Sequence, residues 1–177
     1  MKTLTLFFFF VFTTLFTANA QITKGNWIVG GDATFLYADG KIDIGGKTFT
    51  MRCSPNIGYF FFDKMAAGIK TDYTFSRTKV PNGTSTFEML SLAPFARYYF
   101  LEIEKPTNVF LESSYSMSVL SNSSNKEFLL KGGTAIFLNS SVAFEIALEY
   151  ANSTSKNVYI GDNKILLNFG IQVHLEK

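Results

Sequence analysis

Charged side chains that recur at every second position are the residues of this chain best suited to chemistry. Glu145 and Glu149 lie four residues apart, so an extended strand would place both carboxylates on one face. Two carboxylates on one face can form the acid–base pair that hydrolyses glycosides. Lys131 and Arg97 occur on the polar faces of other strand-like runs, and ion pairing with them is the interpretation we favour, because buried charge requires a partner.

A nucleophilic site is not indicated. The chain contains one histidine, His174, and one cysteine, Cys53. Histidine-based catalysis needs a nucleophile and an orienting group beside the ring, and no Ser/His pair is expected to reach one rim of the molecule. We therefore predict a protein that is not an enzyme, with no catalytic residues, no cofactor and no metal site, and with Cys53 as a small apolar residue.

The element that organises these residues is a hairpin at 53–75. Two strand-length runs meet at Asp63-Lys64, and from 65 to 75 the odd positions form one face and the even positions the other. That period of two is typical of a strand with unlike faces. Residues 92–102 resemble 53–63, and 131–150 align on 54–73 without a gap. A hairpin repeated in this way predicts a β-meander, and so a closed barrel or a sandwich.

The alternation predicts eight strands in all, at 26–38, 48–61, 65–75, 86–100, 108–120, 128–138, 142–150 and 164–175. The connections after the first, third, fifth and seventh strands are longer and polar, at 39–47, 76–85, 121–127 and 151–163. Long connections would then gather at one end and short ones at the other, as in outer-membrane barrels. We predict an all-β chain, an eight-stranded antiparallel up-and-down transmembrane β-barrel.

The first twenty residues read as a secretory signal. Lys2 precedes an apolar run from Leu4 to Phe16, and Ala18 and Ala20 stand at the positions that signal peptidase prefers. We expect residues 1–20 to be the signal peptide, cleaved after Ala20, and 21–177 to be one barrel domain. The formal net charge of +2 comes without a basic stripe, so nucleic acid is not an expected partner.

Alternation does not by itself say which face is inside, and in water the charged face could be an ordinary solvated surface. The polar faces of most strands carry a charged residue, and four basic and five acidic side chains nearly cancel. A barrel in a membrane would hold them in a paired lumenal network, because isolated buried charge is very costly. The predicted network consists of Asp32, Arg52, Lys70, Asp72, Arg97, Glu112, Lys131, Glu145 and Glu149.

Aromatic residues with a polar tip are sorted by height along the strands. Four tyrosines close odd-numbered strands at the long-loop end, and the other residues of this kind lie towards the opposite end. Two such belts are what the two interfaces of a bilayer favour. The predicted belt residues are Trp27, Tyr37, Tyr59, Tyr73, Tyr98, Tyr99, Tyr115 and Tyr150.

Several short motifs resemble those of the small eight-stranded outer-membrane β-barrel, or porin-family, proteins of Gram-negative bacteria. They are Trp27-Ile28-Val29-Gly30-Gly31, Ser54-Pro55 with Gly58-Tyr59-Phe60, Pro94-Phe95-Ala96-Arg97-Tyr98-Tyr99-Phe100, and Ala143-Phe144-Glu145. The resemblance implies a signal peptide, a barrel in the cell outer membrane and no catalysis. Such chains usually end on an aromatic residue, whereas this one ends Leu175-Glu176-Lys177.

These observations favour a monomeric outer-membrane barrel with a largely filled polar lumen and a structural or surface-interaction role. Its expected partners are outer-membrane lipid, the barrel-insertion machinery and surface molecules that meet the long loops. A narrow porin-like path is the alternative within this class. Outside it, Gly25-Asn26-Trp27 and Thr71-Asp72-Tyr73 look like lipocalin signatures, which would indicate a secreted soluble carrier with the apolar face around a hydrophobic ligand. A protein-binding β-sandwich is disfavoured by the even repeat.

Overall fold

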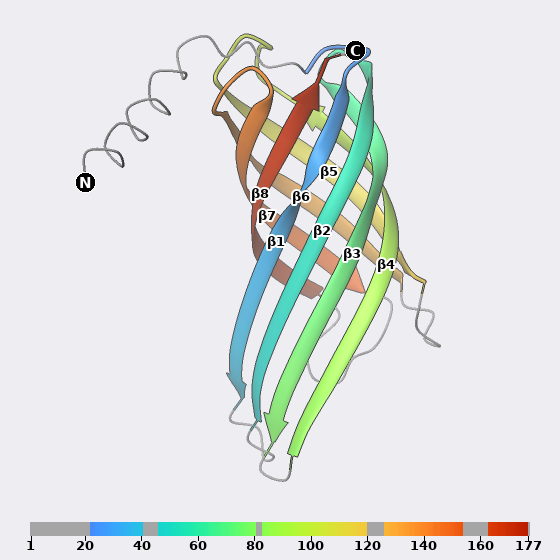
Figure 1. The fold of residues 1–177 in the computed structure, drawn as a ribbon, viewed down its shortest axis with the longest axis vertical. Helices are drawn as coiled ribbons and strands as arrows, with labels where there is room; N and C mark the ends of the chain where they lie inside the picture. The colour runs from blue at the N-terminus through green and yellow to red at the C-terminus, as the bar shows by residue number, and fades with distance from the viewer. Residues whose placement is uncertain (1–21, 41–45, 81–82, 120–125, 154–162, 177) are drawn as a thin grey trace, which may run out of the picture.

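The computed structural model describes residues 22–40, 46–80, 83–119, 126–153 and 163–176. They form β1 (Trp27–Gly40), β2 (Gly46–Phe62), β3 (Met65–Val80), β4 (Gly83–Tyr99), β5 (Thr107–Ser118), β6 (Lys126–Phe137), β7 (Val142–Ser153) and β8 (Asn163–Leu175). Each strand pairs antiparallel with the next, and β8 returns to pair with β1, so the sheet is a closed barrel (Figure 1). The predicted fold class of an eight-stranded antiparallel up-and-down barrel is confirmed.

The predicted long loop at 76–85 is largely strand instead, and the one at 39–47 is strand at both of its ends. β3 and β4 remain paired as far as Val80 and Gly83, and β1 and β2 as far as Gly40 and Gly46. The predicted loops at 76–85 and 39–47 were therefore too long. Their Ser, Thr and Lys residues suggested a loop, but polar strands are stable where water reaches both faces. The connecting residues 41–45, 81–82, 120–125 and 154–162 lie outside the described part of the chain, as does the predicted signal peptide.

The strands β1 to β4 extend beyond the closed part of the barrel. β1 pairs with β2 along its whole length but with β8 only from Trp27 to Ala33, and β4 pairs with β5 only between Ser91 and Tyr99. Figure 1 shows the resulting four-stranded projection at the end opposite the C-terminus. Hydroxyl pairs join β2 and β3 on its even-numbered face, Thr48 with Thr78 at 3.1 Å and Thr50 with Ser76 at 3.0 Å.

At the other end the strands are joined tightly. Lys64 adopts φ +66° in the turn between β2 and β3, a conformation that suits short hairpins. The Asn139 side chain accepts hydrogen bonds from the backbone amides of Ser141 and Val142 at 2.9 and 2.7 Å in the β6–β7 turn. Residues 22–26 precede β1 and lie across this end of the barrel, where the Ile22 carbonyl accepts from the Lys64 amide at 2.8 Å.

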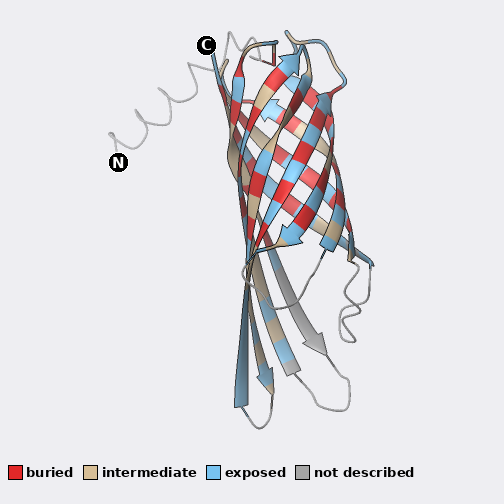
Figure 2. Cartoon of the chain, turned by 90° about the vertical axis from the view of Figure 1, so that its right-hand side faces the viewer, coloured by how far each residue is buried: buried red, intermediate tan, exposed pale blue. Residues whose placement is uncertain are grey.

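Buried and exposed side chains alternate along the strands of the closed barrel (Figure 2). Large apolar side chains such as Phe35, Ile69 and Phe169 are 64%, 55% and 46% exposed, whereas Lys70 and Glu112 are each 2% exposed. This is the reverse of a soluble protein, in which charged residues are almost never fully buried. Within the described residues no helix is long and apolar enough to cross a membrane.

Candidate functional site

The nine predicted network residues all point towards the barrel axis. They come from β1 to β7, and eight of the nine residues are less than 9% exposed, while the side chain of Arg52 is 11% exposed. Eight of them form ion pairs within 4 Å, so the arrangement is one of contacting charges rather than a set of separate polar residues. The β-strand period explains this placement, because every one of these residues shares parity with the buried set of its strand.

Glu112 is the centre of the network. One of its carboxylate oxygens accepts from Lys70 Nζ at 2.6 Å, and the other accepts from Arg97 Nη2 at 2.6 Å and Nε at 2.8 Å. Lys131 Nζ lies 3.6 Å from the same carboxylate. Two planar hydrogen bonds from one guanidinium fix the geometry as well as the charge, so Arg97 and Glu112 join β4 to β5 rigidly.

Arg97 also connects the network to β7. Its Nη1 donates to Glu145 at 2.6 Å, and its guanidinium carbon lies 4.4 Å from the centroid of the Phe110 ring. A desolvated cation over an aromatic face is favourable. A single side chain thus forms ion pairs with two carboxylates while packing against an apolar ring, which is how a charge becomes compatible with full burial.

A second branch of the network crosses the lumen. Lys131 pairs with Asp32 on β1, and Arg52 on β2 pairs with Glu149 on β7. Lys131 also lies 3.8 Å from Glu149, which links the two branches. The Lys131–Asp32 and Arg52–Glu149 pairs join strands that are not neighbours in the sheet, so these two pairs brace the barrel from inside. The structure pairs Glu145 with Arg97 and Glu149 with Lys131, as predicted, and adds Arg52 as a partner of Glu149.

Asp72 is the exception among the nine. It accepts a hydrogen bond from Ser54 Oγ at 2.6 Å, but within the described residues it has no ion-pair partner within 4 Å. Four basic and five acidic residues give the lumen a formal charge of −1 by this count. Asp72 is therefore the residue of the network whose charge contributes least to bracing.

Beyond the charges, towards the short-turn end, five buried aromatic side chains and one isoleucine fill the lumen. We call this set the aromatic plug, and it consists of Ile22, Phe60, Tyr99, Phe110, Phe137 and His174. All but Phe137, at 5%, are no more than 1% exposed. The His174 ring lies 5.2 Å from Phe137 and 5.9 Å from Phe60 between centroids. The imidazole is 3.4 Å from the Tyr99 hydroxyl, so the lone histidine has a packing role inside the barrel.

Tyr99 does not belong to the belts, and this prediction was wrong. It is fully buried, and its hydroxyl accepts from Arg97 Nη1 at 3.1 Å. The sequence contained the signal, because Tyr99 shares parity with Arg97 and two consecutive residues of a regular strand cannot both face outward. Ile22 and Phe110 were missed as plug residues for a different reason. Ile22 precedes the first strand, and Phe110 shows no feature in sequence that distinguishes it.

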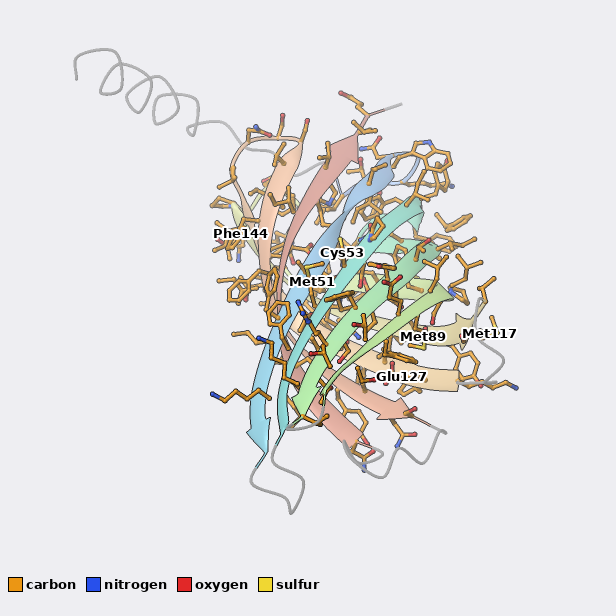
Figure 3. All side chains as sticks on the ribbon, turned by 60° about the horizontal axis from the view of Figure 1, so that its bottom comes forward. Met51, Cys53, Met89, Met117, Glu127 and Phe144 are labelled. Carbon is orange, nitrogen blue, oxygen red and sulfur yellow. The ribbon has the colours of Figure 1, made fainter. Side chains whose placement is uncertain are left out.

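The other belt residues lie on the outer surface. Trp27, Tyr98, Tyr115, Tyr150 and Tyr73 are between 37% and 44% exposed, and Tyr59 packs edge-on against Trp27 with centroids 5.2 Å apart. The side chain of Tyr37 lies outside the described part of the structure. Cys53 and Met117 are also exposed, among the side chains that cover the outer surface in Figure 3.

Across the described ranges, no group of three or more His, Cys, Asp or Glu side chains is arranged to hold a metal ion. Four of the five carboxylates of the lumen are instead paired with lysine or arginine. The site is thus a closed set of internal ion pairs above an aromatic plug, inside a barrel whose outer surface is apolar.

No protein-family model and no curated protein sequence matches the chain. Among solved structures it is similar to Neisserial surface protein A (NspA), with 17% identity over 85% of this chain and 97% of that one and a TM-score of 0.50. It is also similar to the outer membrane protein OprG from Pseudomonas aeruginosa, with 16% identity, coverage of 89% and 100%, and a TM-score of 0.50. The outer membrane enzyme PagL matches at 12% identity, coverage of 82% and 98%, and a TM-score of 0.45. Together with the closed eight-stranded sheet, the first two likenesses show that this chain has the fold of the small outer-membrane β-barrels.

Proposed function

We propose that this protein is a non-conducting barrel of the bacterial outer membrane, with a structural or surface-interaction role. The observation that carries the proposal is the filled lumen, in which a continuous ion-pair network lies above the aromatic plug. An eight-stranded barrel is just wide enough for side chains to fill it. Here arginine, lysine, tyrosine and phenylalanine fill the axis from several strands at once.

The membrane location is supported by the outer surface. Apolar side chains cover the outside of the barrel while the charges are inside, and a large exposed apolar surface would be unstable in water. In a bilayer the same surface is favourable, and closure of the sheet satisfies the backbone hydrogen bonds. The likeness to outer-membrane proteins supports the outer membrane in particular. Cleavage of a signal peptide after Ala20 and insertion by the barrel-insertion machinery as a monomer complete the proposal.

The soluble carrier is disfavoured by a specific observation. A lipocalin-like carrier would place its apolar face around a ligand cavity, but the interior here holds Lys70, Glu112 and Glu149 at 2% exposure or less. Catalysis is disfavoured by the ring contacts of His174 and by the ion pairs of Glu145 and Glu149. The projecting strands β1 to β4 offer surface for contacts, which supports an interaction role.

Conductance in planar lipid bilayers tests the proposal. The purified wild-type protein should give no single-channel steps, because the plug leaves no continuous water path. The double variant Phe60→Ala/Tyr99→Ala should produce steps by removing two rings of the plug, whereas Phe35→Ala on the outer surface should behave as wild type. Reproducible steps from the wild-type protein would overturn the closed-lumen proposal in favour of the narrow porin-like path.

A further inference from the structure

The outer face of the β2–β3 hairpin changes chemistry where it leaves the apolar surface. Tyr73 and Phe75 continue the outward row of β3, and the next two outward residues are Arg77 and Lys79, both exposed. The β2–β3 ladder sets Phe49 opposite Arg77 and Lys47 opposite Lys79. Directly opposed residues have Cβ atoms ~5 Å apart, and diagonal ones lie ~7–8 Å apart. Three cations and an exposed ring therefore form one compact block on paired strands.

The height of this block follows from strand geometry. Strands rise ~3.4 Å per residue and tilt ~40° in membrane barrels. The ten residue steps from Met65 to Phe75 then climb about 26 Å, close to the ~25 Å apolar band of such barrels. Arg77 and Lys79 stand two and four residues further on, about 5 and 10 Å above the band. This is the level of the lipid headgroups, on the side opposite the short turns.

Two of the three cations in the block, those on β3, are not paired with a carboxylate in the described part of the structure. Neither Arg77 nor Lys79 has an ion-pair partner among the residues the structure describes, and like charges directly opposed in a ladder are destabilising. The outward carboxylate on β4, Glu88, interacts with Tyr73. At the short-turn rim, by contrast, cations meet acids, as in the pair of Lys105 with Glu102 at 3.7 Å. The long-loop rim thus carries positive charge on Arg77 and Lys79 that no described ion pair balances.

We propose that Lys47, Phe49, Arg77 and Lys79 form a binding site for a phosphorylated lipid of the outer leaflet. The phosphate is held by Arg77, Lys79 and Lys47, since arginine binds phosphate through two parallel hydrogen bonds. An acyl chain attached to the same lipid lies against Phe49, which is 42% exposed, and along Met51 below it. A lipid fits better than an acidic protein segment because the cations continue upward from an apolar row without a break. The inference rests on the proposed membrane location.

Retention of lipid by the purified barrel tests the site. Lipid A, a phosphorylated glycolipid, is titrated onto the detergent-solubilised protein, and native mass spectrometry counts the bound molecules. The double variant Arg77→Gln/Lys79→Gln should lose about tenfold or more in apparent affinity, because charge-assisted hydrogen bonds to phosphate are lost. The control Lys24→Gln/Lys105→Gln removes equal charge at the opposite rim and should bind as wild type. Arg77→Lys/Lys79→Arg, which keeps both charges, should restore most of the affinity.

Two further probes identify the group that is recognised. Glycolipid whose phosphates have been removed should bind all variants equally weakly, and inorganic phosphate should not displace lipid A. Equal retention of lipid A by the Arg77→Gln/Lys79→Gln variant, full binding of the dephosphorylated glycolipid, or displacement by inorganic phosphate would each overturn the proposal. Heat-modifiable gel mobility of every variant checks that the barrel is folded. Fractionation of cells tests the membrane location separately, so failure of one proposal is not mistaken for failure of the other.

Discussion

At the scale of single residues, Glu112 has the largest consequence for stability, because its carboxylate lies within 4 Å of two lysines and an arginine. Glu112→Ala would leave Lys70 and Arg97 buried with too few partners, and removing one partner of a buried pair costs about 3–5 kcal/mol. Unfolding by urea in detergent should show a loss of this size. This measurement tests the network directly. A change in the free energy of unfolding of under about 1 kcal/mol would mean that the ion pairs do not stabilise the barrel.

Asp72 provides the matched control for that experiment. It is as deeply buried as the network, at 5% exposure, but its described contact is the hydrogen bond from Ser54. Asp72→Asn keeps an acceptor for that hydroxyl and removes the charge of the network that has no ion-pair partner within 4 Å among the described residues. The free energy of unfolding should therefore stay within about 1 kcal/mol of wild type. A loss equal to that of Glu112→Ala would indicate that burial of charge matters here and pairing does not.

Gly30 is a second residue at which a small change should matter. A Cβ atom there would overlap the Ile171 carbonyl oxygen and lie 2.9 Å from the Gln172 Cα, so the β1 and β8 backbones would have to separate. Overpacking of this kind costs about 1–3 kcal/mol. Gly132→Ala is the control, because its nearest neighbour is Leu111 Cδ1 at 3.8 Å. Gly30→Ala should lower the heat-modifiability midpoint on gels, Gly132→Ala should not, and equal midpoints would contradict the predicted overlap.

At the scale of elements, one strand should show two dynamic regimes. Lys70 and Asp72 lie within the closed barrel, whereas Thr78 and Val80 lie in the projection of β1 to β4, beyond the last pair of β4 with β5. Backbone hydrogen bonds that water can reach open more readily than those in a packed core. Hydrogen exchange in detergent micelles should be slower at Lys70 and Asp72 than at Thr78 and Val80. Uniform protection along β3 would show that the projection is part of the rigid body.

The strands were the part of the structure that the sequence predicted best. Strict alternation predicted all eight strands, because a period of two has no other common structural cause. It failed at strand ends, where Ser, Thr and Lys around 76–80 are equally suited to a loop or to a strand in water. The alternation could not predict which charged side chains form ion pairs across the lumen. Arg52 and Glu149 are 97 residues apart, and their contact depends on the shear of the closed barrel, which no local pattern specifies.

At the scale of the whole molecule, the direction of insertion is testable by labelling. In a Cys53→Ser background, a cysteine at Thr84 would lie in the projection, and one at Glu104 would lie at the short-turn rim; both positions are exposed. With the long-loop end outside, a membrane-impermeant maleimide should label Thr84→Cys in intact cells and Glu104→Cys only after cell lysis. The opposite result would invert the topology, and with it the leaflet that Arg77 and Lys79 face.

The closing contact between the first and last strands has a mechanical consequence. Its ladder runs only from Trp27 to Ala33 of β1, and the two strands are the most distant neighbours along the chain. Loop closure over so long a separation is slow, so the pairing of β1 with β8 should be the last to form during folding. When force is applied to its two termini, the β1–β8 ladder should separate first. The sheet should then open before any hairpin unfolds.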